Sequence, residues 1–393
     1  MNAPLAPPLI HWTEHGAAQS ARWRSEAGIA PPKRVVVADD SMTADAAYRI
    51  ACEGSAILWR GDFQNARQLV QALARRVDKS ALKGPKSGTK NAAKNASPKT
   101  VSITDAFHRH RLAQGQRART LGMLLIAFEA DHGIALRRAP DVRAACREAF
   151  GAADQPYIAS LRELLGLIGA HEWRRKGVEI AALNERIHPH YGVFSPVRGE
   201  YVDLVAAAPL PATELAFDVG TGTGVLAALL ARRGVQRVVA TDSDARALAC
   251  ARDNLKRLGM AQQVEVAEAD LFPATPARAP LIVCNPPWLP GRPSSSLERA
   301  IYDLDSRMLR GFLDGLAAHL TPGGEGWLIL SDLAEHLGLR TRDALLAWVE
   351  SAGLRVIDRL DARPRHPKAF DVADPLHAAR SAEVTSLWRL AAR

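Results

Sequence analysis

Regular alternation of short apolar runs with helix-like segments, from Glu214 onward, constrains the fold of this chain most. Five runs are typical of strands: ELAFDVG, RVVATD, QVEVAEAD, PLIVCN and GWLILSD. Such alternation indicates a parallel sheet with helices on both faces. Two further runs, LRVIDRLDA (354–362) and VTSLWRLAAR (384–393), predict a final antiparallel pair at the edge of the sheet. The sequence therefore predicts an α/β fold, with a seven-stranded, mostly parallel, Rossmann-like sheet over 190–393.

The first half of the chain is predicted to be a separate, mixed α/β N-terminal domain over 1–185. Residues 34–40 (RVVVADD) indicate a strand, and residues 55–76 indicate a strand, a Gly-Asp turn and an amphipathic helix. Residues 79–100 contain five lysines after Lys79 and no acidic residue, which predicts a flexible basic loop. Residues 101–185 are predicted to be helical. We expect 1–78 and 101–185 to form one domain that the loop interrupts.

The net charge of +9 is divided unevenly along the chain. Residues 1–190 hold 28 Lys and Arg against 18 Asp and Glu, a balance of +10, whereas residues 191–393 have a balance of −1. A basic excess of this kind favours a polyanionic partner, RNA or the ribosome, for the N-terminal half. A solvated basic surface that only aids solubility is the alternative.

Composition argues against several other classes of protein. With 47% hydrophobic residues the chain is not disordered throughout. There is no uncharged apolar stretch of about 18 residues and no secretory pattern at the N-terminus, so we predict neither a membrane span nor a membrane partner. Four scattered cysteines without a CxxC pair indicate reduced thiols and a cytoplasmic location. HRH (108–110) and HPH (188–190) lack further ligands at matching spacing, and we predict no metal site.

A glycine-rich turn, DVGTGTG (218–224), follows the first strand of the predicted sheet. Glycines at such a turn let the backbone approach a ligand closely, and the helix that follows adds N–H donors. The spacing is G-x-G-x-G rather than the dinucleotide-binding G-x-G-x-x-G, and the turn by itself is a weak signal. It nominates five cofactor-binding residues: Asp218, Gly220, Thr221, Gly222 and Gly224.

Two more acidic residues follow the next two strands. Asp242 ends RVVATD, about 20 residues past the glycines, where a carboxylate can accept hydrogen bonds from ribose hydroxyls. Asp270 ends VEVAEAD and is placed to meet an adenine amino group, with Leu271 and Phe272 covering the ring. Helix N-capping is the alternative for each Asp. Capping does not predict acidic residues at three successive strand ends on one edge, so we favour a cofactor site.

Asn285-Pro286-Pro287-Trp288 follows the strand LIVC. The two prolines end the strand ladder and hold the segment rigid. The Asn285 side-chain oxygen and the Pro286 carbonyl can each accept a hydrogen bond from an NH₂ group, which would orient a poorly nucleophilic planar nitrogen for attack. Trp288 offers a flat face on which an amide or a base can stack. We predict these four residues to be the catalytic ones of an enzyme that acts on such a nitrogen.

DVGTGTG, ATDSD, EADLF and NPPW, in this order and spacing, resemble the class I S-adenosylmethionine methyltransferases, and within them the HemK-type or "methyltransferase small domain" group. The resemblance covers roughly 190–393 and implies an N-methyltransferase with S-adenosyl-L-methionine as the cofactor, which needs no strong general base. It implies that Asp218 and the glycines surround the methionine part, Asp242 the ribose and Asp270 the adenine, with Leu271 and Asn285 beside the cofactor. Residues 191–205 correspond to the segment that closes over cofactor and substrate, although their sequence differs from that of the glutamine methyltransferases.

The acceptor is left open between several classes. We favour a nucleobase in RNA, because the N-terminal half is large and basic. A glutamine in a release factor or ribosomal protein and a small-molecule amine are the alternatives, as is a non-catalytic RNA-binding or assembly module that fails to bind the cofactor. Phe194 is predicted to line the substrate site. Arg198 is expected either to orient the substrate or to pair with Glu200 at the surface.

Overall fold

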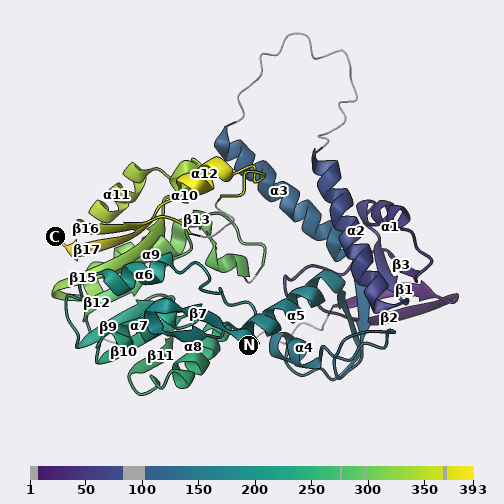
Figure 1. Ribbon diagram of the computed structural model, residues 1–393, viewed down its shortest axis with the longest axis horizontal. Helices are drawn as coiled ribbons and strands as arrows, with labels where there is room; N and C mark the ends of the chain where they lie inside the picture. Colours follow the sequence, from purple (N-terminus) through teal and green to yellow (C-terminus); the bar gives the residue numbers. More distant parts are fainter. Residues whose placement is uncertain (1–7, 83–101, 275–276, 296, 366–369) are drawn as a thin grey trace, which may run out of the picture. The chain divides into compact units, whose positions relative to one another are not determined.

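The computed structural model describes residues 8–82, 102–274, 277–295, 297–365 and 370–393 (Figure 1). The predicted basic loop at 79–100 lies outside the described residues from position 83 onward. The chain divides into two compact units, 1–171 and 172–393. The boundary falls within one helix and lies earlier than the predicted one at 185–190.

The first unit is built on a six-stranded sheet with the order β1-β2-β6-β5-β4-β3. Strand β4 comes before the 83–101 segment and β5 after it, and the two pair in parallel, so both parts of the N-terminal half share one sheet. Helices α2 and α3 lie side by side (Figure 1). The strands are β1 (Leu9–Glu14), β2 (Ala17–Trp23), β3 (Val35–Ala38), β4 (Ala56–Trp59), β5 (Leu124–Phe128) and β6 (Tyr157–Ser160). The helices are α1 (Ala44–Cys52), α2 (Phe63–Leu82), α3 (Ile103–Gly122), α4 (Arg143–Phe150) and α5 (Leu161–Lys176), which continues into the second unit.

The predicted strand at 34–40 and the strand, turn and helix at 55–76 are confirmed by β3, β4 and α2. The prediction that 101–185 is helical is wrong at β5, at β6 and at the hairpin of β7 (Val178–Ile180) and β8 (Glu185–Ile187). Strands β5 and β6 are almost entirely buried. A short apolar run of this kind has no polar face, so its periodicity does not distinguish a buried strand from a helix.

The second unit contains a seven-stranded sheet with the order β11-β10-β9-β12-β15-β17-β16. Strands β9 to β12 and β15 are parallel, whereas β17 is antiparallel to both of its neighbours, β15 and β16. The predicted α/β fold, the seven-stranded sheet and the final antiparallel pair are confirmed. The strands are β9 (Leu215–Val219), β10 (Arg237–Asp242), β11 (Val264–Glu268), β12 (Ala279–Cys284), β15 (Leu320–Ser331), β16 (Leu354–Ala362) and β17 (Thr385–Ala392).

Helices cover both faces of this sheet, because successive strand residues point to opposite sides. Ala216 packs with α6 and α7 on one face, and Phe217 packs with α9 and α11 on the other. The β7–β8 hairpin joins the first of these layers, which is why the second unit begins before residue 185. The helices are α6 (Glu200–Ala207), α7 (Val225–Arg232), α8 (Ala245–Arg257), α9 (Arg307–His319), α10 (Leu333–His336), α11 (Arg342–Ser351) and α12 (His377–Ala382); β13 (Leu289–Pro290) and β14 (Tyr302–Asp303) form a small separate pair.

Among the described residues, no helix has both the length and the apolar character that crossing a bilayer requires.

Candidate active site

The strand register of the second unit brings the predicted motifs to one edge of the sheet. Val219 at the end of β9 is opposite Thr241 of β10 on one side and Cys284 of β12 on the other. The loops that follow these three strands therefore begin at the same level. These are the glycine turn, the segment after Asp242 and the segment that begins at Asn285. Ligands of open parallel sheets bind at this carboxyl edge.

The glycine turn is fixed to the neighbouring strand by backbone hydrogen bonds. The N–H groups of Gly220 and Thr221 donate to the Thr241 carbonyl at 2.9 and 2.8 Å. The φ angles of Gly220, Gly222 and Gly224 are 75°, 55° and 81°. These values lie in the left-handed region, which costs other residues roughly 1–2 kcal/mol each. The turn therefore depends on glycine at all three positions.

Space beside the turn is open at only one of these three glycines. A Cβ on Gly220 would lie 2.5 Å from Met308 Cε, and one on Gly224 would lie 3.2 Å from the Ala251 backbone. A Cβ on Gly222 would have no described atom within 4 Å. Backbone with open space beside it, next to a carboxylate at a strand end, suits a ligand with hydroxyl groups and positive charge. The residues present therefore fit the cofactor that the motifs imply.

Asp218 is buried beneath the turn. Its Oδ2 accepts a hydrogen bond from the Thr221 hydroxyl at 2.6 Å and another from the Ala227 N–H at 3.1 Å. The second bond caps the first turn of α7, so the capping role that the sequence left open does apply to Asp218. Burial raises the pKa of this carboxyl from 3.8 to about 6.

Asp218 is expected to make the protein more stable in mild acid. Its pKa is higher in the folded than in the unfolded chain, so the folded state gains stability when pH falls through 6. Between pH 7 and pH 5 the free energy of unfolding should rise by about 1.4 kcal/mol more in the wild type than in Asp218→Asn. Urea unfolding of both proteins at a series of pH values measures this difference. A difference that does not change with pH would contradict the assignment.

Asp242 joins two loops rather than capping the next helix. Its Oδ2 accepts a hydrogen bond from the Gly222 N–H and its Oδ1 accepts one from the Asp244 N–H, each at 3.0 Å. The cap of α8 is Asp244, whose side chain accepts from the Arg246 N–H. Burial raises the pKa of Asp242. The capping alternative therefore does not apply to Asp242.

The segment after β11 is held by its backbone and its apolar side chains. The Thr241 hydroxyl donates to the Leu271 carbonyl at 2.5 Å, and Leu271 has a φ of 79°. Gly311 and Gly315 of α9 leave room for this segment, because a Cβ there would lie 2.7 Å from Leu271 and 2.5 Å from Phe272. Asp270, in contrast, is 73% exposed and pairs with Arg307 at 2.8 Å.

Asn285 and Trp288 are in direct contact within the predicted catalytic motif. Trp288 Nε1–H donates to Asn285 Oδ1 at 2.8 Å. Since an indole N–H only donates, its partner on Asn285 must be the oxygen. The oxygen keeps a second lone pair for another donor. Pro286 is buried, and Pro287 is half-buried. The motif thus presents an amide oxygen of defined orientation at the carboxyl edge of β12.

The segment before the second sheet also reaches this motif. The Arg198 guanidinium lies over the Trp288 ring, 5.0 Å from its centroid. Arg198 pairs with Glu200 at 2.8 Å, as one of the two sequence interpretations expected, but it pairs with Glu383 at 3.1 Å as well. Both carboxylates are buried, so the pairing is not at the surface. Phe194, the other predicted substrate-binding residue, is half-buried.

Several residues at this edge were not predicted from the sequence. Thr241 supplies the carbonyl and the hydroxyl that hold two of the loops. The Asp303 carboxylate accepts from the N–H groups of Met308 and Leu309 at the start of α9, although it lies three residues before Ser306, the N-cap residue of that helix. Glu383 belongs to no motif, and only the pairing of β15 with β17 brings it to this edge.

Residues 184–340 match the family model described as "Methyltransferase small domain". A release factor glutamine methyltransferase of Cereibacter sphaeroides is 33% identical over 43% of this chain and 63% of its own length. A ribosomal protein L11 methyltransferase of Pelotomaculum thermopropionicum is 35% identical over 36% and 39%. A tRNA1(Val) (adenine(37)-N6)-methyltransferase of Klebsiella pneumoniae is 32% identical over 41% of this chain and 77% of its own. The chain thus spans less than two thirds of the first two relatives.

Proposed function

We propose the substrate of this chain, which belongs to the methyltransferase small domain family of class I S-adenosylmethionine-dependent methyltransferases. The enzyme transfers a methyl group to a planar nitrogen, and this nitrogen is the exocyclic amine of a nucleobase in RNA. The observation that carries the planar-nitrogen part is the hydrogen bond from Trp288 to Asn285 Oδ1, because it fixes an amide oxygen as an acceptor for an incoming NH₂ group.

We propose that the cofactor binds at the carboxyl edge of the second sheet, described above. S-adenosyl-L-methionine supplies, when bound, a methyl group on a positively charged sulfur. We propose that the turn around Gly222 holds the methionine part, that Asp242 holds the ribose and that Asp270 with Leu271 holds the adenine. Asp270 would have to exchange its exposed partner Arg307 for the adenine amino group. Surface pairs of this kind contribute little to stability, so the exchange costs little.

The acceptor nitrogen is proposed to bind between Asn285 and Trp288. The lone pair of a planar nitrogen is delocalised, so attack requires that the nitrogen be positioned and that its developing positive charge be stabilised. Asn285 Oδ1 and the Pro286 carbonyl would each accept a hydrogen bond from the NH₂ group. Trp288 would stack on the base or amide, with Arg198 on its other face. Such a site suits an adenine or guanine amine and a glutamine amide equally well.

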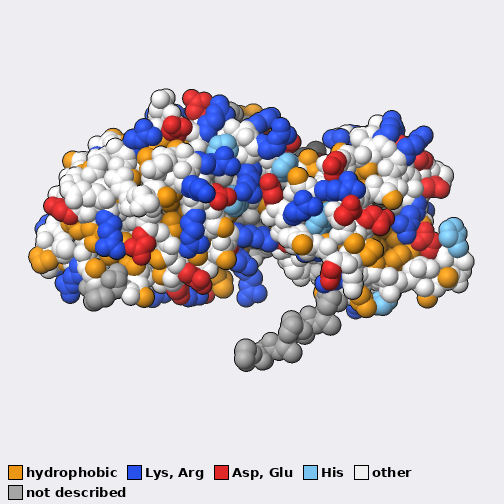
Figure 2. Space-filling model, turned by 90° about the horizontal axis from the view of Figure 1, so that it is seen from below, with side chains coloured by type: hydrophobic (Ala, Val, Ile, Leu, Met, Phe, Trp, Pro, Cys, Tyr) orange, Lys and Arg blue, Asp and Glu red, His pale blue; other side chains and the backbone are white. Residues whose placement is uncertain are grey.

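The preference for RNA rests on the first unit. Its neighbouring helices α2 and α3 carry five exposed basic residues: Arg67, Arg75, Lys79, Arg109 and Arg119. On the face of the molecule seen in Figure 2, Lys and Arg are interspersed with Asp and Glu rather than gathered in one patch. We therefore propose that α2 and α3, rather than the whole basic surface, contact phosphates. An RNA acceptor would also place the enzyme in the cytoplasm.

A protein glutamine is the second candidate, because the relative from Cereibacter sphaeroides is named a release factor glutamine methyltransferase. Labelled S-adenosylmethionine, offered with RNA, DNA and ribosomal or release-factor protein from cells that lack this gene, distinguishes the two. We expect label in the RNA fraction with the wild type. Label in the protein fraction would overturn the nucleobase proposal and support the glutamine one.

Binding to RNA should weaken with salt, and less steeply once α2 and α3 lose charge. Each phosphate contact adds about 0.7–0.9 to the slope of log K against log [salt]. Changing Arg75→Glu and Arg119→Glu together should therefore lower the slope by about 1.4–1.8 and weaken binding at low salt. Fluorescence anisotropy with labelled tRNA or rRNA fragments measures both.

Arg355→Glu is the control, because Arg355 is exposed on β16 of the second unit. It changes the net charge in the same direction as each of the two substitutions and by the same amount as one of them, but it removes no proposed phosphate contact. An equal fall in slope for the control and for the double variant would mean that α2 and α3 have no special role.

A further inference from the structure

Arg198, Glu200 and Glu383 form an ion cluster that contacts Trp288 of the proposed catalytic motif. Arg198 is held by two carboxylates, Glu200 at 2.8 Å and Glu383 at 3.1 Å, and these are only 4% and 3% exposed. Burying two carboxylates beside a half-buried guanidinium costs solvation free energy that their attraction does not always recover. Two carboxylates on one guanidinium also leave a net negative charge. An arrangement of this kind is a poor way to gain stability, which points to a role in positioning.

Glu383 enters the cluster from a distant part of the chain. It lies beyond residues 184–340, the part that matches the family model. The antiparallel register of β15 and β17 sets Ser331 opposite Thr385, so Glu383, two residues before β17, lies at the carboxyl edge of β15. The Ser331 hydroxyl donates to Glu383 Oε1 at 2.6 Å, and the same oxygen receives Arg198. Glu383 is therefore fixed by the strand end and in turn fixes Arg198.

The cluster ends at the proposed acceptor site. Arg198 lies over the Trp288 ring at 5.0 Å, within the range of a cation–π contact. Trp288 Nε1–H binds Asn285 Oδ1 at 2.8 Å. The contacts run without a break from Glu383 through Arg198 and Trp288 to the amide oxygen that is proposed to accept the substrate NH₂. A small displacement of that oxygen is costly, because a shift of about 1 Å in a reacting group can lower the rate about 100-fold.

We propose that Glu383 is a positioning residue for methyl transfer: through Arg198 it holds Trp288 in the orientation that presents Asn285 Oδ1 to the acceptor nitrogen. The proposal rests on the proposed function of Asn285, but its structural part does not. It assigns a role in the reaction to the short segment that leads into β17.

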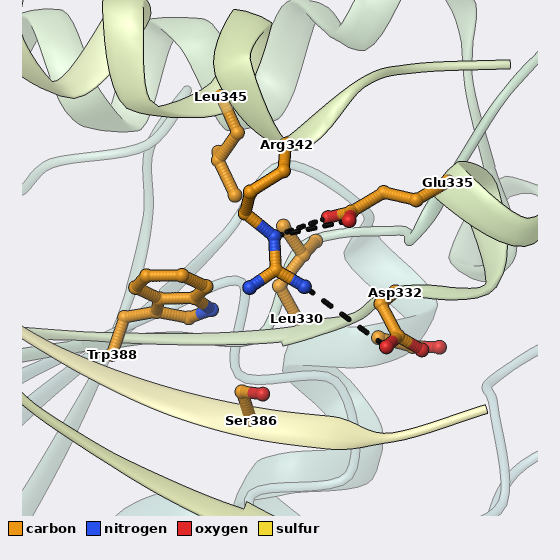
Figure 3. Close-up of a pocket in the computed structure, with 8 residues that line it drawn as sticks. Leu330, Asp332, Glu335, Arg342, Leu345, Ser386 and Trp388 are labelled. Atoms are coloured by element: carbon orange, nitrogen blue, oxygen red, sulfur yellow. Dashed lines mark hydrogen bonds and ion pairs between the residues drawn. The ribbon is translucent and has the colours of Figure 1, made fainter. Parts of the chain in front are cut away.

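A second arrangement in the same unit provides a control. Arg342 lies over the Trp388 ring at 5.1 Å and pairs with Glu335 at 2.8 Å and with Asp332 at 4.0 Å. Figure 3 shows Arg342 between Trp388 and these two acids. The hollow drawn there contains none of the predicted cofactor or substrate residues. Arg359 lies over the same Trp388 ring at 5.0 Å and pairs with Asp361 at 2.8 Å. Of the described stacks on Trp288 and Trp388, only the one on Trp288 contacts the proposed catalytic motif.

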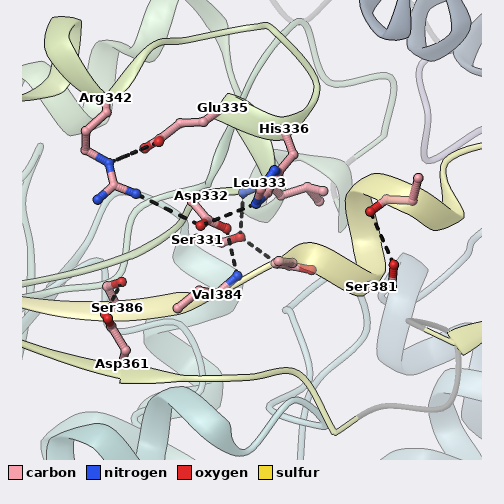
Figure 4. Close-up of polar contacts among 12 residues, drawn as sticks. Ser331, Asp332, Leu333, Glu335, His336, Arg342, Asp361, Ser381, Val384 and Ser386 are labelled. Atoms are coloured by element: carbon pink, nitrogen blue, oxygen red, sulfur yellow. Dashed lines mark hydrogen bonds and ion pairs between the residues drawn. The ribbon is translucent and has the colours of Figure 1, made fainter.

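The Trp288 stack and the Trp388 stack are both held at the end of β15, but through different residues. Figure 4 shows Ser331 and Asp332 side by side, with Asp332 receiving the Val384 N–H at 2.7 Å and Arg342 on its other side. The Ser331 hydroxyl donates a hydrogen bond to Glu383, whereas Glu335 accepts a hydrogen bond from Arg342. Glu383→Gln and Glu335→Gln therefore remove equivalent charges from neighbouring stacks, and they differ in whether Trp288 is involved.

Indole N–H signals in a nitrogen-15 NMR spectrum test the structural part without any substrate. The chain has eight tryptophans, and Trp288→Phe and Trp388→Phe identify two of the signals. We expect Glu383→Gln to shift or broaden the Trp288 signal and leave the Trp388 signal unchanged, and Glu335→Gln to do the reverse. A Trp288 signal unaffected by Glu383→Gln overturns the proposal. If Glu383→Gln does not fold, Arg198→Lys is read in the same way, since it keeps the charge but loses the flat guanidinium.

Kinetics test the positioning role. With the acceptor fraction that takes up label, Glu383→Gln should lower kcat about tenfold or more and leave the Kd for S-adenosylmethionine within about twofold. Glu335→Gln should leave both unchanged. A shifted Trp288 signal with a normal kcat overturns the positioning role. If the wild type labels no acceptor at all, the proposed function fails, and the NMR result still decides whether Glu383 orients Trp288.

Discussion

Asn285→Ala should lower kcat for methyl transfer by about 100- to 1000-fold, comparable to the loss of one preorganised hydrogen-bonding group in other active sites. The substitution removes the amide oxygen that Trp288 fixes at 2.8 Å, and with it the proposed acceptor for the substrate NH₂. It also leaves the Trp288 N–H without its partner. Because the motif follows β12 and does not belong to the glycine turn, we expect cofactor affinity to change only a few-fold. Single-turnover transfer from labelled S-adenosylmethionine measures the first quantity, and calorimetry measures the second.

Asn285→Asp is the conservative comparison, because it keeps both the shape and the accepting oxygen. An aspartate has the same outline and still accepts hydrogen bonds from Trp288 and from an NH₂ group, but it cannot donate. We expect it to retain clearly more activity than Asn285→Ala. Equal activity of Asn285→Ala and wild type would exclude the proposed role. Loss of cofactor binding in parallel with kcat would show instead that the residue shapes the cofactor site.

The motifs at the carboxyl edge were predictable because each one reflects a local requirement. Left-handed φ values select glycine at Gly220, Gly222 and Gly224, and the register of neighbouring parallel strands brings the loops after β9, β10 and β12 to one level. Alternating strands and helices are likewise a local pattern. The final antiparallel pair was predicted from the same kind of pattern, whereas the order of the strands in the sheet was not predicted.

What was missed depends on contacts between distant segments. Glu383 reaches the site through the pairing of β17 with β15, and nothing within a few residues of it indicates a partner at Arg198. Strand β5 reads as an apolar run that suits a helix equally well, and only its place inside the first sheet settles its structure. Asp218 shows a third kind of difference, because its carboxylate supports the turn and caps α7 at the same time. In that case supporting the glycine turn and capping the helix are not exclusive roles.

Asp242→Ala should weaken S-adenosylmethionine binding about 100-fold, the second large effect that we expect. Two hydrogen bonds from ribose hydroxyls to a carboxylate are each worth about 1.5–3 kcal/mol, and the loss of both exceeds 2.7 kcal/mol, which corresponds to a factor of about 100. The substitution also frees the Gly222 N–H, which Asp242 Oδ2 accepts at 3.0 Å, so the open side of the turn loses its support. Asp242→Asn keeps one oxygen for that N–H and should lose only about tenfold.

Asp244→Ala provides the matched comparison, two residues away. Asp244 caps α8 by accepting the Arg246 N–H at 2.8 Å, and it has no proposed contact with the cofactor. Its replacement should lower the free energy of unfolding by about 1 kcal/mol and leave the Kd within about threefold. Calorimetric titration with S-adenosylmethionine and urea unfolding of the wild type and all three variants separate the two effects. If Asp242→Ala and Asp244→Ala bound the cofactor equally well, Asp242 would be a structural link between two loops, and the ribose would have to be held elsewhere on this edge.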